Sequence, residues 1–351
     1  MSAASELPFA HGGPALTGVM RAQPEDFFVD EDLGFALEGQ GEHFFLRVEK
    51  RGANTDFVAK ELARFAGLSP DAVSFAGMKD RHAVTRQTFS VHIPGKANPD
   101  WSALKHAEFQ VLEATRHNRK LKRGALRGNR FVLRLRELTG DRDAAEKTLQ
   151  AIRARGVPNY FGEQRFGREG DNVDRARAMF AGKRVPRHIQ GILISSARSS
   201  IFNAVLAERA SRDSWDRPMQ GEVWMLDGSH SVFGPEELTP DLERRLAEFD
   251  IHPTGPMWGR GELRTRDAVL ELEQAALAAL PGLAEGLERE GLKQERRSLR
   301  LRPENFAWTW SDESLELSFG LPAGAYATVI VRELMQSAAL IQSEPVDAAS
   351  I

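Results

Sequence analysis

A single acid in a basic segment is the first feature of this sequence that could perform chemistry. Asp80 lies in the segment FAGMKDRHAVTRQTFSV, and no second acid accompanies it. Within six residues of Asp80 the other ionisable side chains are all basic: Lys79, Arg81, His82 and Arg86. An unperturbed aspartate is already ionised at neutral pH, so these cations would instead attract a phosphate backbone or orient the carboxylate, as in an enzyme acting on nucleic acid. Spacing alone favours a plainer interpretation, a turn residue with weak surface ion pairs.

A longer basic stretch follows between Arg116 and Arg136. It reads RHNRKLKRGALRGNRFVLRLR and contains no acid, although the whole chain has a net charge of −3. Acids gather instead between Asp213 and Glu295. A basic stripe beside an acidic remainder is typical of a protein that holds a polyanion on one face. A solvated basic loop explains such a charge run equally well.

Composition excludes several kinds of chemistry. The 351 residues include no cysteine, which excludes disulfides, thiolate catalysis and cysteine-ligated metal sites. Apolar residues at 41% and charged residues at 28% are typical of a soluble globular protein, and no uncharged apolar run of about 18 residues predicts a membrane span. The start, MSAASELPFAHGGPA, has no signal-peptide pattern, so we expect a cytoplasmic protein of about two domains.

The elements that must position these residues are predicted by periodicity, and they indicate an α+β fold. Alternation predicts strands at 27–29, 44–48, 73–75, 88–93, 131–135, 299–302 and 315–319. Amphipathic spacing and capping signals predict helices at 54–65, 144–155, 267–280 and 325–335. For the helix at 144–155 the expected cap is Asp143, and Gly156 closes it. The sequence PTGP at 253–256 predicts a turn.

The segment around Asp80 resembles the signature of the TruD family, tRNA pseudouridine synthase D. Further segments resemble the same family in the same order, and together they extend from about residue 18 to 340. They are RAQPEDFFVDE (21–31), GEHFFLRVEKRGANT (41–55), LRGNRFVLRLR (126–136), GVPNYFGEQRFGREGDN (156–172), SIFN (200–203), PTGP (253–256) and LPAGAYATVIVRELM (321–335). The NYFG block within the fourth segment is particularly specific.

The resemblance implies an isomerase that converts uridine to pseudouridine within tRNA. Uracil is detached from C1′, turned and rejoined through C5, without redox change or net hydrolysis, so the resemblance implies no cofactor. The family's obligatory aspartate corresponds to Asp80. Its carboxylate would attack the sugar, attack the base, or remove the C2′ proton to form a glycal, and the sequence does not separate these routes. The implied target is uridine 13, notably in glutamate tRNA, with no membrane or protein partner.

The resemblance also implies a pocket for a uridine that has left the RNA stack. Phe27 and Tyr326 would form its walls, Asn129 would contact the uracil or ribose with Phe131 beside it, and Lys79 would lie close to the chemistry. Pattern alone favours core positions for Phe27 and Phe131 and a turn position for Asn129. The role of Arg21 stays open, because related sequences often carry lysine before the PEDF segment and the two residues are not interchangeable.

Phosphate contacts are expected from cations of the basic stretch, which would add salt-dependent affinity without reading bases. The candidates are Lys120, Lys122, Arg123, Arg127 and Arg130.

The family architecture implied here is a pseudouridine synthase catalytic domain with a mixed or antiparallel sheet, interrupted by a TruD-type α/β insertion domain. The catalytic domain would comprise 1–155 and 297–351, and the insertion 156–296. The RNA would lie in the cleft between the two, against the basic stretch.

Two other functions fit parts of the sequence. A metal-dependent nuclease would use Asp80 with His82 and His92, although a second acid is missing and two-metal sites generally need several carboxylates. A noncatalytic tRNA-binding or folding factor would use the basic stretch and would not need Asp80.

Overall fold

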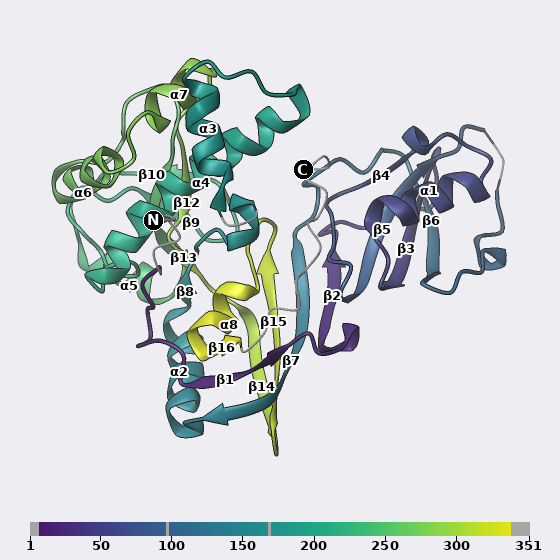
Figure 1. The fold of residues 1–351 in the computed structure, drawn as a ribbon, viewed down its shortest axis with the longest axis horizontal. Helices are drawn as coiled ribbons and strands as arrows, with labels where there is room; N and C mark the ends of the chain where they lie inside the picture. Colours follow the sequence, from purple (N-terminus) through teal and green to yellow (C-terminus); the bar gives the residue numbers. More distant parts are fainter. Residues whose placement is uncertain (1–6, 96–97, 168–169, 338–351) are drawn as a thin grey trace. The chain divides into compact units, whose positions relative to one another are not determined.

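The computed structural model describes residues 7–95, 98–167 and 170–337, and its chain divides into two compact units (Figure 1). Among the described residues, the sheet unit comprises Leu16–Gly140, Glu304–Gly324, Gln336 and Ser337. The helical unit comprises residues 7–15, Asp141–Pro303 and Ala325–Met335. Each unit therefore combines segments that are far apart in the sequence.

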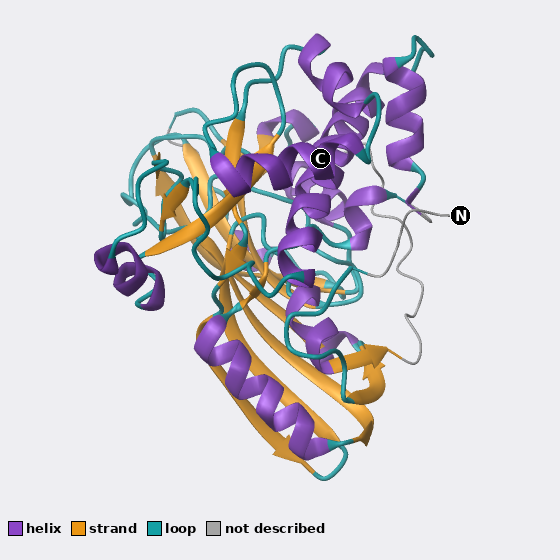
Figure 2. Ribbon diagram, turned by 90° about the vertical axis from the view of Figure 1, so that its left-hand side faces the viewer, coloured by secondary structure: helices purple, strands orange, loops and turns teal. Residues whose placement is uncertain are grey.

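A mixed sheet forms the sheet unit (Figure 1, Figure 2). Its strands follow the order β14-β15-β7-β2-β5-β3-β6, with β1 joined to β7 and β4 joined to β5. All these pairings are antiparallel except that of β2 with β5. The strands are β1 (Leu16–Met20), β2 (Phe27–Asp32), β3 (His43–Arg51), β4 (Val73–Phe75), β5 (Val84–His92), β6 (Phe109–His117), β7 (Gly128–Gly140), β14 (Glu304–Ser311), β15 (Ser314–Pro322) and β16 (Met335–Ser337), which pairs with β1. The predicted α+β class is confirmed.

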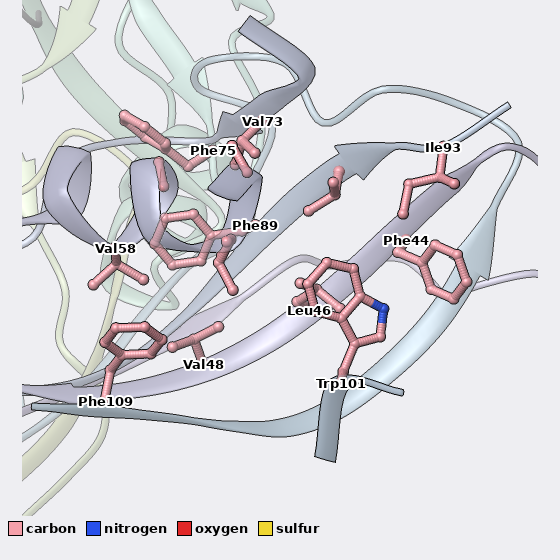
Figure 3. Packing of buried hydrophobic residues seen from close by; sticks show 14 of the residues in the cluster. Phe44, Leu46, Val48, Val58, Val73, Phe75, Phe89, Ile93, Trp101 and Phe109 are labelled. Atoms are coloured by element: carbon pink, nitrogen blue, oxygen red, sulfur yellow. The ribbon is translucent and has the colours of Figure 1, made fainter. Parts of the chain in front are cut away.

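Helix α1 (Thr55–Phe65) builds the core of the sheet unit. Its apolar residues recur at helical spacing, and Val58 and Leu62 are fully buried in a cluster with Val48 of β3 and Phe89 of β5 (Figure 3). Burial of an aliphatic or aromatic side chain of this size contributes about 1.5 to 3 kcal/mol. The helix predicted at 54–65 is confirmed, and this packing also buries its first residue, Thr55.

The helical unit contains helices α2 to α8, drawn in purple in Figure 2, and two small sheets. The longest helix, α4, packs against α3, α6 and α7. The helices are α2 (Arg142–Arg155), α3 (Asn172–Phe180), α4 (Arg187–Ser211), α5 (Pro240–Ala247), α6 (Asp267–Ala278), α7 (Leu283–Arg289) and α8 (Thr328–Leu334). The sheets are β10-β9-β11-β12 and β13-β8, formed by β8 (Val157–Pro158), β9 (Trp224–Leu226), β10 (Val232–Phe233), β11 (Ile251–Met257), β12 (Glu295–Ser298) and β13 (Arg300–Leu301).

The cap of α2 differs from the prediction. Asp141, not Asp143, precedes the helix, and its side chain accepts a hydrogen bond of 2.9 Å from the Ala144 N–H. Asp143 lies in the first turn, where a negative charge suits the helix dipole. Gly156 ends the helix with φ +80°, as its position in the sequence predicted.

The predicted turn at 253–256 is wrong, because these residues lie in strand β11. They are buried, and β11 pairs with β9 through its first half and with β12 through its second. A Cβ added at Gly255 would come within 2.9 Å of Leu299 and 3.1 Å of Phe202. The glycine therefore serves close packing rather than a bend.

The division of the chain into domains at 1–155, 156–296 and 297–351 stays a prediction.

None of the helices in the described ranges combines the length and apolar character that a membrane crossing requires.

Candidate active site

The register of the central strands gathers three of the predicted pocket residues, Phe27, Asn129 and Phe131, on one sheet face. Phe27 is paired with Leu133, and two residues later Val29 is paired with Phe131. Glu31 is paired in turn with Asn129. Paired residues and every second residue along a strand share a face, so the side chains of Phe27, Glu31, Asn129 and Phe131 project to the same side.

The two phenylalanines of this face are closely packed. Phe27 and Phe131 expose only 5% and 7% of their surfaces, and their ring centroids lie 6.2 Å apart in an edge-to-face arrangement. Phe131 also stacks on Phe319 of β15 at 5.5 Å. The rings are thus core residues, as the pattern alone favoured, and they form a firm aromatic layer beside the site.

Asp80 lies in the irregular segment 76–83 between β4 and β5, called here the Asp80 turn. Its two carboxylate oxygens have different partners. Oδ1 accepts a hydrogen bond of 2.9 Å from the His82 N–H, and Oδ2 lies 2.9 Å from Nη1 of Arg21. The side chain remains 21% exposed, so a fixed carboxylate is still accessible from outside.

Arg21 connects the acid to the aromatic layer. It follows β1 with φ +64°, a left-handed conformation that arginine seldom adopts, and its guanidinium carbon lies 4.1 Å from the ring centroid of Phe27. Burial lowers the pKa of Arg21, and the charge of Asp80 opposes that lowering. Because an arginine stays protonated in proteins, the pair presents a cation and an anion side by side.

Buried side chains hold the backbone of the Asp80 turn. The Lys79 N–H donates to Thr55 Oγ1 at 3.0 Å, and Thr55 Oγ1 donates to Gln87 Oε1 at 3.1 Å. The Gln87 amide donates in turn to the Gly77 carbonyl. Thr55 and Gln87 are fully buried, so α1 and β5 both fix this turn.

Lys79 forms an ion pair that the sequence did not indicate. Its Nζ lies 2.8 Å from Glu31 Oε1, and Glu31 Oε2 accepts a hydrogen bond of 2.9 Å from the Thr88 N–H. Only 9% of the Lys79 side chain and 1% of the Glu31 side chain is exposed.

Asn129, the register partner of Glu31, has a buried Oδ1 that meets no donor among the described residues. Buried acceptors seldom lack a hydrogen-bond partner in folded proteins.

The loop at 118–127, called here the basic loop, lies against the Asp80 turn. The Gly124 N–H donates to the Ala76 carbonyl at 2.7 Å. Leu121 is 2% exposed and packs with Ala76 and Phe45, whereas the side chains on either side of it, Lys120 and Lys122, are exposed. The buried leucine therefore anchors to the Asp80 turn a loop whose cations face solvent.

The five cations predicted to contact phosphates are all exposed, but they do not form one group. Lys120, Lys122, Arg123 and Arg127 belong to the basic loop, and Arg127 forms an ion pair with Asp32. Arg130 lies in β7 between Asn129 and Phe131, so alternation directs it to the opposite sheet face. The structure does not bring Arg130 together with the other four.

Tyr326 belongs to the helical unit. Its hydroxyl accepts a hydrogen bond of 3.1 Å from Arg165 Nε, and Arg165 Nη1 donates to Ser195 Oγ at 3.0 Å. Its ring lies edge-on to Phe161, with centroids 6.3 Å apart. Arg165 thus orients Tyr326 within its own unit.

The nuclease alternative would require a cluster of metal-ligating side chains. In the described ranges, no three His, Asp or Glu side chains gather in a way that could hold a metal ion. His92 Nε2 lies 3.6 Å from Glu42, and its ring stacks on His43 at 4.7 Å. A nuclease site built on Asp80, His82 and His92 lacks the additional carboxylates that such chemistry generally needs.

Comparison with known proteins identifies the family. The model of the family "tRNA pseudouridine synthase D (TruD)" matches residues 7–175 and 169–334. The tRNA pseudouridine synthase D of Xanthomonas axonopodis pv. citri is 53% identical over 352 residues, covering 95% of this chain and 95% of its own. That of Aeromonas salmonicida is 51% identical over 333 residues, covering 95% of this chain and 94% of its own.

A solved structure shares the fold. The crystal structure of the putative TruD protein from Methanosarcina mazei matches with a TM-score of 0.72 at 22% identity, covering 93% of this chain and 95% of that one. Fold and relatives together define the class as pseudouridine synthase, an isomerase. The chain belongs to the TruD family.

Proposed function

We propose that this protein converts uridine to pseudouridine in tRNA, at uridine 13 and foremost in glutamate tRNA, with Asp80 as the reacting group. The observation that carries the proposal is the state of Asp80. Its carboxylate is fixed by Arg21 and the His82 N–H, yet a fifth of the side chain is exposed. It also lies in a turn bonded to the basic loop. An acid held in this way beside a cationic loop suits attack on a nucleoside within RNA.

The reaction conserves every atom of the nucleoside. The C1′–N1 bond breaks, uracil turns, C5 bonds to C1′, and the proton leaving C5 is balanced by a proton gained at N1. One carboxylate oxygen attacks C1′, attacks the base, or accepts the C2′ proton, and all three routes need the same fixed acid. Arg21 keeps that acid oriented in each of them.

A flipped-out uridine needs a surface to receive it. Extrusion costs a few kcal/mol, and stacking on an aromatic ring offsets about 1 to 3 kcal/mol for each base. Phe27 and Phe131 form the aromatic layer on the face of the sheet that also carries Asn129. The Oδ1 of Asn129, which meets no donor in the described part of the chain, suits a donor such as the uracil N3–H, and Lys79 is held close by through Glu31. The role of Tyr326 as a further wall depends on the family resemblance alone.

Phosphate contacts are assigned to Lys120, Lys122, Arg123 and Arg127 of the basic loop, with Arg130 apart from them. The proposal includes no cofactor, membrane or protein partner. A tRNA substrate would be met in the cytoplasm, where we expect the protein to act. We also propose that residues 156–296 form the TruD-type insertion within a catalytic domain of 1–155 and 297–351.

A single assay separates the three candidate functions. Unmodified tRNA is incubated with the protein in the presence of EDTA, and pseudouridine is mapped by carbodiimide-blocked primer extension across a pool of tRNAs. A stop at position 13 supports the isomerase. Cleavage that appears only when metal is restored supports the nuclease, and binding without either product supports a noncatalytic factor.

A further inference from the structure

A buried lysine outside the proposed reaction has an unusual environment. Lys50 of β3 is 1% exposed, and no carboxylate among the described residues is bonded to it. Its Nζ donates instead to three backbone carbonyls, those of Ala53 at 2.8 Å, Asp80 at 3.0 Å and Lys79 at 3.4 Å. An ammonium has three donors, so these carbonyls match its hydrogen-bonding capacity.

Stability alone does not explain a lysine at this position. Lys50 is paired with Thr85, and Val48 with Gln87, so Lys50 continues a strand face on which Val48 and Leu46 are fully buried. A charge in such a place is costly to desolvate, and a well-packed apolar side chain of similar volume is often neutral or stabilising there. A methionine would fill the same space without that cost.

The carbonyls that Lys50 contacts belong to the segment carrying the reacting acid. Thr55 and Gln87 hold the Asp80 turn at Lys79 N–H and at the Gly77 carbonyl. Lys50 holds it at the carbonyls of Lys79 and of Asp80 itself. These two peptide units flank the Cα from which the carboxylate projects, so their orientation determines where the carboxylate points.

We propose that Lys50 is a positioning residue that fixes the backbone of Lys79 and Asp80 through its ammonium and thereby aims the Asp80 carboxylate. The orientation of Asp80 matters for turnover only under the proposed function, in which Asp80 reacts. The electrostatics are consistent with this role. Burial lowers the pKa of Lys50 to about 8, the carboxylate of Asp80 opposes that lowering, and the cation of Lys79 adds to it. Both charged groups come from the Asp80 turn itself.

The experiment compares Lys50→Met with Lys60→Met, the same change at an exposed position of α1. Hydrogen exchange of the peptide covering 76–83 reports backbone order without reference to activity. We expect faster exchange of this peptide in Lys50→Met, with the rest of the chain and the melting temperature unchanged or improved. Single-turnover modification of tRNA should slow by about tenfold or more, because small misplacements of a reacting group are costly. The Kd for tRNA should stay at the wild-type value, and Lys60→Met should match wild type throughout.

A purely structural role would give a different pattern. It would lower the melting temperature of Lys50→Met while leaving both the single-turnover rate below the transition and the exchange of 76–83 unchanged, and that result overturns the proposal. Should wild type itself make no pseudouridine, the proposed function fails, and the exchange of 76–83 still decides whether Lys50 fixes the turn. If wild type forms pseudouridine and Lys50→Met forms it at the same rate, the positioning role is refuted while the proposed function stands.

Discussion

The Arg21 guanidinium lies between the Asp80 carboxylate and the Phe27 ring. It is 2.9 Å from Oδ2 of the acid, and its central carbon is 4.1 Å from the ring centroid. One side chain therefore links the proposed reacting group to the aromatic layer. This contact also assigns a place to the residue whose role the sequence left open.

Replacement of Asp80 by asparagine should abolish turnover without loss of tRNA binding. The amide keeps the shape and removes the reacting charge, so we expect modification to fall by about a hundredfold or more. Primer-extension mapping gives the rate and filter binding gives the Kd. Asp71→Asn, at an exposed residue of the same region, is the matched control. Turnover near the wild-type rate in Asp80→Asn would remove Asp80 from the chemistry.

The turnover of Arg21 variants should depend on which of the two contacts of Arg21, with Asp80 and with Phe27, each variant keeps. Arg21→Lys keeps a cation for Asp80 but loses the planar group over Phe27, a contact worth about 0.5 to 2 kcal/mol, so turnover should fall several-fold. Arg21→Met loses both and should be slower still, because the carboxylate loses its fixed partner. Single-turnover rates measure the order. Equal rates for Arg21→Met and wild type would show that the ion pair has no part in the reaction.

Lys122→Ala should weaken binding and leave the chemical step intact. Loss of one phosphate contact should make the slope of log Kd against log salt shallower by about one. Titration of tRNA at several salt concentrations gives this slope, and single turnover at saturating tRNA gives the rate. Lys60→Ala on α1 serves as the comparison. An unchanged slope places Lys122 outside the RNA interface.

The pKa of Lys50 predicts a pH dependence of stability. Its folded-state value of about 8 lies below the usual 10.5, so between these two pH values the unfolded chain binds more protons than the folded one. The free energy of unfolding should therefore rise with pH across this window, by up to about 3 kcal/mol. Urea unfolding of wild type and Lys50→Met at a series of pH values isolates the contribution. A constant difference between the two proteins from pH 8 to 10.5 contradicts it.

Leu62→Ala should destabilise the sheet unit. Leu62 of α1 is fully buried, and its truncation should cost about 2 to 5 kcal/mol through lost burial and a cavity. Urea unfolding measures this cost, with Arg64→Ala on the exposed side of the same helix as the control. A loss below that of Arg64→Ala would mean that α1 contributes little to the core.

The fold was predictable wherever local signals agreed. The helical spacing of Val58 and Leu62 identified α1, and Gly156 marked the end of α2. The cap was misassigned because Asp141 and Asp143 are both good capping residues, and only the hydrogen bond to Ala144 distinguishes them. Gly255 was mistaken for a turn residue because its close neighbours, Leu299 and Phe202, are distant in the sequence.

The residues proposed for the site come from the family resemblance and their roles stay predictions, whereas the side chains that support them could not be inferred from the sequence. Asp80, Phe27, Asn129 and Phe131 followed from the family resemblance, whereas Glu31 and Lys50 were missed. One signal for Glu31 was present, since the alternation of Phe27 and Val29 continues to it and places it on the buried face. Lys50 gave no such signal, because two of its three partners, the carbonyls of Lys79 and Asp80, lie about thirty residues away and the pairing of β3 with β5 brings them together.

The bond between Gly124 and Ala76 limits how this protein can diversify. This hydrogen bond joins the basic loop, which would contact the RNA phosphates, to the Asp80 turn. Leu121 is buried beside it. An insertion between 121 and 124 would disturb catalysis as well as affinity. Relatives that act on differently shaped RNAs should therefore differ in the charges of this loop or in its length outside residues 121–124. The length between residues 121 and 124 should stay the same.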